Sequence, residues 1–248
     1  MPPIRFGQIY RYDSPNQHGA FAYLVSIVGS TWMYFNPWNG EWIFNITDAP
    51  SLFWGYSRLE PPTNFKFGPK GEVLIYILSP DGRWLALWNS SAIPELLAGP
   101  VGTLAWQWRP YGKVVDGSKG YVWNVSLPEP VPGTINFLFD DKMLVSAGLR
   151  RGFSFYPTEN FTVWCISLKP GEQGKILWKR TYTPEEIGAA NGSTLEFVTA
   201  SAEDKVFVLW CCQTRQHWAF SLEDGRKIWG PSEAQPSWDF TVGTHHAI

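Results

Sequence analysis

The chain has 248 residues, 15 of them tryptophan, and its aromatic fraction of 17% equals its charged fraction. This aromatic content and a net charge of −2 exclude a disordered segment, because such a chain can bury a large apolar core. A pI near 6.1 and the lack of a long Lys/Arg run exclude a nucleic-acid binder that works by bulk electrostatics. The 23 glycines and 20 prolines disfavour a helical bundle, so a β-rich globular protein remains.

The first apolar stretch of the chain predicts two strands rather than a membrane span. Residues 14–40 carry no Asp, Glu, Lys or Arg, and residues 19–35 are largely apolar, which approaches the length of a transmembrane helix. However, Gly29-Ser30-Thr31 interrupts a run rich in β-branched and aromatic side chains, which favours strands at 21–28 and 32–36. The first five residues lack the features of a signal peptide. We therefore expect membrane attachment only through an anchor missing from this chain.

The clearest organisation is a hairpin that recurs along the chain and ends in an aromatic residue. Residues 221–229 read Ser-Leu-Glu-Asp-Gly-Arg-Lys-Ile-Trp, in which Asp-Gly is a strong signal for a two-residue hairpin turn. Residues 167–178 repeat the Ser-Leu, the glycine turn and the closing Trp. Looser copies occupy residues 36–44, 79–88 and 117–123. The turn glycines at 40, 82, 120, 174 and 225 lie about 46 residues apart on average, a period typical of four-stranded blades.

This repeat predicts an all-β fold, a β-propeller of four-stranded antiparallel blades in which residues 1–248 form a single domain. The length holds about five blades, which form either a small closed ring or an incomplete piece of a larger propeller. We expect one aromatic residue of each copy to be a buried plug between neighbouring blades: Trp42, Trp88, Trp123, Trp178 and Trp229.

Whole blades can be drawn for the last two copies. Their strands are expected at 134–139, 142–147, 162–168 and 175–180, and at 195–199, 205–212, 217–222 and 227–229. Short helices are expected at 91–98 and 184–190, and Thr183 caps the second of them together with Glu186.

The Ser-Leu-x-x-Gly-Arg/Lys-x-Ile/Leu-Trp pattern of residues 221–229, expanded at 167–178, resembles the quinoprotein-like (PQQ-like) propeller repeat. The likeness is strongest over residues 134–229. Members of this family are often secreted or membrane-anchored, so the resemblance implies an extracytoplasmic protein, and it marks a fold rather than a reaction. It implies either a scaffold that binds partner proteins or a dehydrogenase that holds pyrroloquinoline quinone and calcium. We expect the non-catalytic binding module, without a cofactor.

Three cysteines, Cys165, Cys211 and Cys212, are too few for a disulfide framework and are interpreted as buried thiols. A bridge from Cys165 to the adjacent pair, or a disulfide within that pair, is the alternative. Some dehydrogenases of the family hold an adjacent pair as a disulfide against the cofactor, and the resemblance implies this role for Cys211 and Cys212. Alternation along the preceding apolar strand instead sends their sulfurs to opposite faces. With no recognisable calcium-ligand cluster, we predict no catalytic, cofactor-binding or metal-binding residue.

Two further groups of residues bear on function. Asn-X-Ser/Thr sequons predict a glycosylated, cell-exterior surface, and they begin at Asn45, Asn89, Asn124, Asn160 and Asn191. Trp106 and Trp108 lie outside the repeat and share a strand face. They either pack between blades or form an aromatic shelf for a glycan or a protein partner, so a glycan-binding propeller is a second alternative function.

Overall fold

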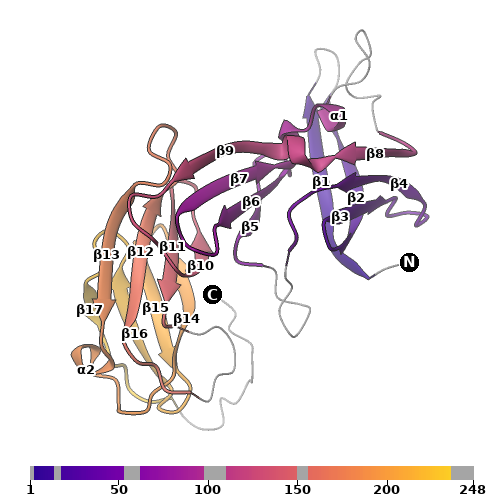
Figure 1. The fold of residues 1–248 in the computed structure, drawn as a ribbon. Helices are drawn as coiled ribbons and strands as arrows, with labels where there is room; N and C mark the ends of the chain where they lie inside the picture. The colour runs from indigo at the N-terminus through magenta and orange to yellow at the C-terminus, as the bar shows by residue number, and fades with distance from the viewer. Residues whose placement is uncertain (1–2, 14–17, 53–61, 98–109, 150–155, 236–248) are drawn as a thin grey trace. The chain divides into compact units, whose positions relative to one another are not determined.

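The computed structural model describes residues 3–13, 18–52, 62–97, 110–149 and 156–235, and these form an all-β protein with four sheets (Figure 1). Sheet 1 has the strand order β1-β2-β3-β4-β8, with bounds Ile4–Asp13, His18–Val28, Thr31–Phe35, Trp42–Thr47 and Lys113–Asp116. Sheet 2 has the order β5-β6-β7-β9, with bounds Phe65–Phe67, Val73–Leu78, Trp84–Asn89 and Tyr121–Ser126.

The last two sheets follow the strand pattern that the sequence predicts for whole blades. Sheet 3 consists of β10 to β13, with bounds Thr134–Leu138, Lys142–Ala147, Phe161–Ser167 and Ile176–Tyr182. Sheet 4 consists of β14 to β17, with bounds Leu195–Ser201, Val206–Cys211, Gln216–Ser221 and Lys227–Trp229. In both sheets each strand pairs antiparallel with the next strand along the chain.

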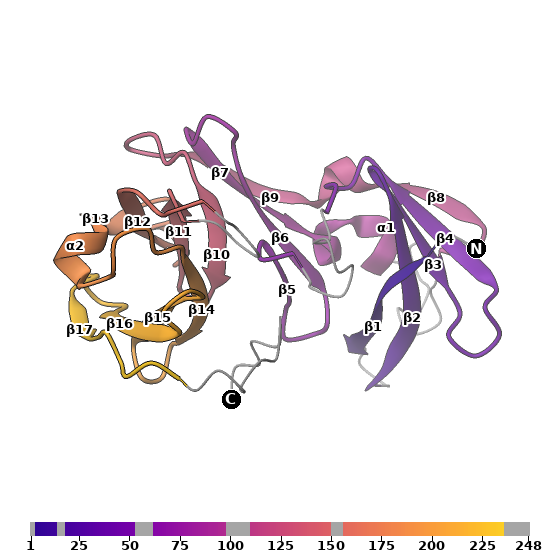
Figure 2. The same ribbon diagram turned by 90° about the horizontal axis from the view of Figure 1, so that it is seen from below.

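The described chain divides into two compact units. The first comprises Met1–Ile77 and Leu85–Asn124, and the second comprises Leu78–Trp84 and Val125–Ile248. In the first unit, the inner face of sheet 1 packs with residues of β6 and β7 in one apolar cluster. In the second unit, sheets 3 and 4 share a second cluster and lie side by side in both views (Figures 1 and 2). The single domain over residues 1–248 stays a prediction.

Alternation of side chains explains why the first apolar stretch forms strands. Along β2, Phe21, Tyr23, Val25 and Ile27 point into the core of the first unit, while Ala22 and Leu24 are only partly buried. This period of two is that of a strand with one face on a core. The predicted strands at 21–28 and 32–36 are therefore confirmed. No helix among the described residues is long and apolar enough to cross a membrane.

The turn glycines predict about five blades, whereas the residues that the structure describes form four sheets. Three of the turn glycines lie near the end of the loop between the third and fourth strands of sheets 1, 3 and 4: Gly40, Gly174 and Gly225. Gly82 instead lies between β6 and β7, the second and third strands of sheet 2, and Gly120 ends the 3-10 helix η3 (Gly117–Gly120). The Asp-Gly signal marks a turn, but it does not say which pair of strands the turn joins.

The hairpin loops are also longer than predicted. Ser221 N donates to Arg226 O and Gly225 N donates to Ser221 O, so four residues separate the bonded ends instead of two. The same two bonds occur between Asn36 and Glu41 and between Gly40 and Asn36. Glycine is required at the last loop position because φ is +74° at Gly225 and +73° at Gly40.

Both predicted helical segments are short connections. The first is the 3-10 helix η1 (Ser90–Ala92) followed by α1 (Pro94–Leu97), and the second is α2 (Pro184–Ile187). The capping box at α2 is confirmed, because Thr183 Oγ1 accepts from Glu186 N and the Glu186 carboxylate accepts from Thr183 N.

Candidate functional site

The loops at one end of sheets 3 and 4 carry the repeat's charged residues, and we call Asp141, Lys142, Lys169, Lys205, Glu223 and Asp224 the turn surface. Equivalent backbone hydrogen bonds position the two halves of this surface. Leu168 N donates to Asp141 O in sheet 3, and Leu222 N donates to Lys205 O in sheet 4, both over 2.8 Å. The Ser-Leu motif therefore fastens the loop after the third strand to the turn between the first two strands in both sheets.

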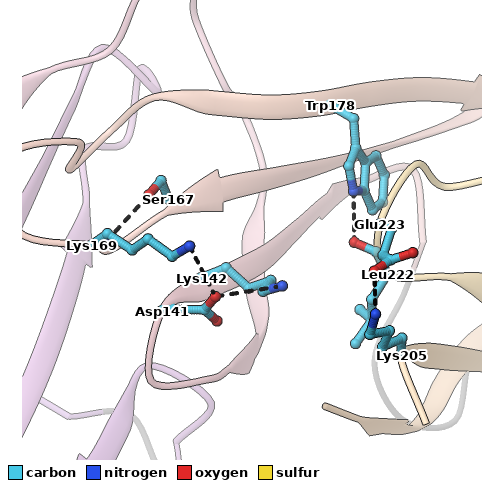
Figure 3. A network of polar contacts seen from close by, with 8 residues as sticks. All are labelled: Asp141, Lys142, Ser167, Lys169, Trp178, Lys205, Leu222 and Glu223. Carbon is cyan, nitrogen blue, oxygen red and sulfur yellow. Dashed lines mark hydrogen bonds and ion pairs between the residues drawn. The ribbon is translucent and has the colours of Figure 1, made fainter. Parts of the chain in front are cut away.

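Ion pairs join Asp141 to two lysines in sheet 3 and Lys205 to Glu223 in sheet 4 (Figure 3). The Asp141 carboxylate lies 3.6 Å from Lys142 Nζ and 3.8 Å from Lys169 Nζ. Lys205 Nζ donates to Glu223 Oε1 over 2.6 Å, with both side chains more than half exposed. This hydrogen bond lowers the pKa of Glu223 and raises the pKa of Lys205, and Lys142 lowers the pKa of Glu223 further. Because exposed pairs of this kind add little stability, their side chains remain available to a partner.

Trp178 joins the two sheets directly behind this surface. Its Nε1 donates to Leu222 O over 2.8 Å, as Figure 3 shows, and its ring stacks on Phe207 with centroids 6.2 Å apart. On the same side, Arg180 Nε donates to Asp224 O over 2.7 Å, and the hydroxyl of Tyr182 donates to Gly225 O. The fourth strand of sheet 3 thus holds the last loop of sheet 4, which carries part of the turn surface, through three hydrogen bonds.

The predicted plug residues occupy different positions. Trp88 is fully buried on β7, and its Nε1 donates to Gly117 O over 2.7 Å. Trp123 and Trp178 are partly buried on β9 and β13. Trp42 and Trp229 lie on β4 and β17 but are 45% and 48% exposed, so they do not fill a buried position among the described residues. Trp42 is exposed because a β-bulge beside it turns the next two residues, Ile43 and Phe44, towards the core.

A buried tryptophan recurs on the third strands of the sheets, and among these residues the sequence analysis predicts only Trp88 as a plug. Each of the four sheets has one there, and each is nearly or fully buried: Trp32, Trp88, Trp164 and Trp218. Their Nε1 groups donate to Pro50 O, Gly117 O, Glu129 Oε1 and Ile187 O. The signal was present in the sequence, since Trp32, Trp164 and Trp218 each precede the turn glycine of their own hairpin.

A pocket of about 20 Å³ lies on the inner face of sheet 1 in the first unit. Strands β1 to β4 and η1 supply most of its wall: Gln8, Tyr10, Tyr23, Tyr34, Phe44 and Ser90. Burial, and then the neighbouring Tyr23, raises the pKa of Tyr34, while burial and Glu72 raise the pKa of Tyr10 to about 12. These phenols therefore stay neutral at physiological pH.

The predicted glycosylation sites differ in exposure. Asn124, Asn160 and Asn191 are exposed. Asn45 and Asn89 are partly buried, and their side-chain oxygens accept hydrogen bonds from Trp42 Nε1 and from Ser91 N. Trp106 and Trp108, the predicted ligand shelf, lie outside the described residues.

The three cysteines are free thiols. Cys165 and Cys211 are fully buried in the cluster between sheets 3 and 4, and Cys212 is partly buried. The resemblance implies pyrroloquinoline quinone and calcium as an alternative, and calcium requires several oxygen ligands. No group of three or more His, Cys, Asp or Glu able to hold a metal is found within the ranges that the structure describes.

Comparisons with known proteins add little to this picture. No family model and no curated protein sequence matches the chain. Among solved structures, it is similar to Kluyveromyces lactis Hsv2, with a TM-score of 0.33 and 10% sequence identity. That match covers 86% of this chain and 61% of the other, so the chain spans less than two thirds of that protein's length.

Proposed function

We propose that this chain is a non-catalytic binding or scaffold module, built as a β-propeller of the PQQ-like repeat type, that acts outside the cytoplasm. The observation that carries the proposal is the turn surface. It gathers exposed charged side chains from loops of two sheets, on a base held by Trp178, Arg180 and Tyr182. Loops fixed by a rigid scaffold are the usual location of protein-binding residues. The expected partner is a protein with complementary charges.

A photo-crosslinking residue placed on the turn surface tests this proposal in the native host. Lys169 belongs to the turn surface, and Glu203 is exposed in the same loop of sheet 4 as Lys205. Glu185, exposed on α2 at the opposite end of β13, is the matched control (Figure 1). We expect a discrete adduct from the two loop positions, weakened by the charge reversals Lys205→Glu and Asp141→Lys, and no adduct from Glu185. Equal labelling from all three positions, or none from any, would contradict the proposal.

The compartment is tested separately, by the intact mass of the protein purified from its native host. Exposure favours Asn124, Asn160 and Asn191 as the glycosylated sites, because an attached glycan requires a surface position. We expect added mass that the triple substitution of these residues by Gln removes. Unmodified asparagine at all five sequons would refute the extracytoplasmic part of the proposal.

The enzyme alternative rests on the adjacent pair Cys211 and Cys212 and is tested by titration. A quinone-dependent dehydrogenase takes up pyrroloquinoline quinone in a calcium-dependent manner with a change in visible absorbance. The binding module is expected to show neither change. For the glycan alternative, replacing Trp106 and Trp108 with Ala removes the predicted shelf, and sugar binding that persists in this variant rejects that site.

A further inference from the structure

The pocket on the inner face of sheet 1 is the strongest unassigned feature of the first unit. Its aromatic wall is ordered: the rings of Tyr34 and Phe44 stack 4.3 Å apart, and Tyr23 meets both edge-on at 5.4 and 5.7 Å. Strand register explains this arrangement, since Tyr34 pairs with Phe44 across β3 and β4, and Gln8 pairs with Tyr23 across β1 and β2. Neighbouring strands therefore point these side chains into one place.

One polar group in this wall has no partner within the structure. Tyr34 is only 2% exposed, and its hydroxyl makes no hydrogen bond to any residue within the described ranges. A buried hydroxyl without a partner is costly, so native proteins rarely keep one without a reason. By contrast, the buried hydroxyl of Tyr182 in the second unit has Gly225 O as its acceptor. The free group at Tyr34 therefore points to an additional molecule in the pocket.

The chemistry of the wall limits what that molecule is. The lining residues that the structure describes carry no charged side chain. Gln8 Nε2 already donates to Gly71 O, and Ser90 Oγ accepts from Val73 N, which leaves the amide oxygen of Gln8 and the hydroxyl hydrogen of Ser90 as further polar groups. A volume of about 20 Å³ accommodates one oxygen-sized group. Aromatic rings beside neutral hydrogen-bonding groups suit a neutral, hydroxyl-bearing ligand rather than an anion or a metal ion.

We propose that this pocket binds one hydroxyl group of a neutral sugar, with the Tyr34 hydroxyl as its hydrogen-bond partner. Tyr10 and Leu96 in the wall are only partly buried, so the rest of the ligand extends past them towards solvent. The site extends the proposed function by naming a ligand class for the first unit, and it does not depend on the turn surface in the second unit.

Ligand-observed NMR of the full chain tests this site with glucose, galactose, mannose and N-acetylglucosamine. We expect saturation transfer to at least one sugar at about 10 mM, and a loss of affinity of about tenfold or more in Tyr34→Phe. Tyr34→Phe removes one oxygen and keeps the ring stack, so the variant should fold as the unaltered chain does. Circular dichroism checks this. Tyr156→Phe, a change at a residue that is 67% exposed, is the matched control and should bind as the unaltered chain does.

Two results would overturn the inference. Absence of transfer to every sugar in the unaltered chain means that the pocket holds only water. Equal sugar affinity in the unaltered chain and Tyr34→Phe means that sugar binds elsewhere. Neither result affects crosslinking from Lys169 and Glu203, so failure of the sugar site is distinguishable from failure of the proposed function.

Discussion

The indole nitrogen of Trp178, on the fourth strand of sheet 3, donates a hydrogen bond to the carbonyl oxygen of Leu222, in the last loop of sheet 4, over 2.8 Å. Register shows which residue is the counterpart of Trp178 in the next sheet. Trp178 pairs with Cys165, and Trp229 pairs with Ala219 at the corresponding place in sheet 4. Trp178 is covered by its neighbouring sheet, whereas Trp229 is 48% exposed. The same repeat position therefore has two different environments.

This difference predicts unequal effects of truncating the two tryptophans. Trp178→Ala removes a ring stacked on Phe207 and leaves Leu222 O without its donor, so it should lower the free energy of unfolding by about 2–4 kcal/mol. Trp229→Ala removes a half-exposed ring and should cost less than about 1 kcal/mol. Urea denaturation followed by circular dichroism measures both. Equal losses would mean that sheet 4 packs Trp229 as tightly as sheet 3 packs Trp178.

Removing single phenol oxygens should separate a bonded hydroxyl from a free one. Tyr182→Phe deletes the donor to Gly225 O and leaves that carbonyl unpaired, which should destabilise the protein by about 1–2 kcal/mol. Tyr34→Phe deletes a hydroxyl that has no protein partner, so it should change the stability by less than about 0.5 kcal/mol or raise it. Thermal denaturation without added sugar compares the pair. A larger loss in Tyr34→Phe would reveal a tightly bound water at that hydroxyl.

Sequence patterns predicted the second half of the chain better than the first because local signals and tertiary pairing agree there. The Ser-Leu motif, the loop glycine and the closing Trp lie on consecutive strands in sheets 3 and 4, and every predicted strand of these sheets is confirmed. In the first half, β8 joins sheet 1 as a parallel neighbour of β4 from more than sixty residues away. No local pattern in Lys113–Asp116 predicts that pairing, because the register of parallel strands depends on contacts between residues far apart in the sequence.

The candidate sites were less predictable for the same reason. The turn surface assembles from acidic and basic residues that the sequence analysis could interpret only as separate turns. Only the register of two sheets brings Lys142 close enough to lower the pKa of Glu223. The pocket at Tyr34 likewise needs four strands and η1 together. Its one sequence signal, aromatic residues at alternate positions of β2, also describes an ordinary core face.

The loop glycines should differ in their tolerance of a methyl group. A Cβ at Gly225 would lie 2.8 Å from Trp178 Cζ3 and 2.9 Å from the hydroxyl oxygen of Tyr182, in addition to the strain of φ at +74°. Gly171 has a similar φ of +81°, but nothing lies within 4 Å of a Cβ there. We expect Gly171→Ala to cost about 1 kcal/mol from backbone strain alone, and Gly225→Ala about 2–4 kcal/mol. Chemical denaturation measures both, and similar costs would show that Trp178 and Tyr182 shift without penalty.

The buried thiol of Cys165 should make the protein less stable at alkaline pH. Burial is the main cause that raises its pKa to about 12, whereas a thiol in an unfolded chain has a pKa of about 8.5. Between these values the folded state holds a proton that the unfolded state has lost, so the free energy of unfolding falls as the pH rises. From pH 8 to pH 10 this group should remove about 1–2 kcal/mol.

Replacing the thiol isolates this contribution from those of the other ionisable groups. Cys165→Ala and Cys165→Ser both lack an ionisable group at this position, so their unfolding free energies should decline less steeply over the same pH range than that of the unaltered chain. Urea titrations at half-unit steps of pH measure the three slopes. Because a cavity or a buried hydroxyl lowers stability equally at every pH, the slope reports ionisation rather than packing. Identical slopes would show that Cys165 ionises without unfolding of sheet 3.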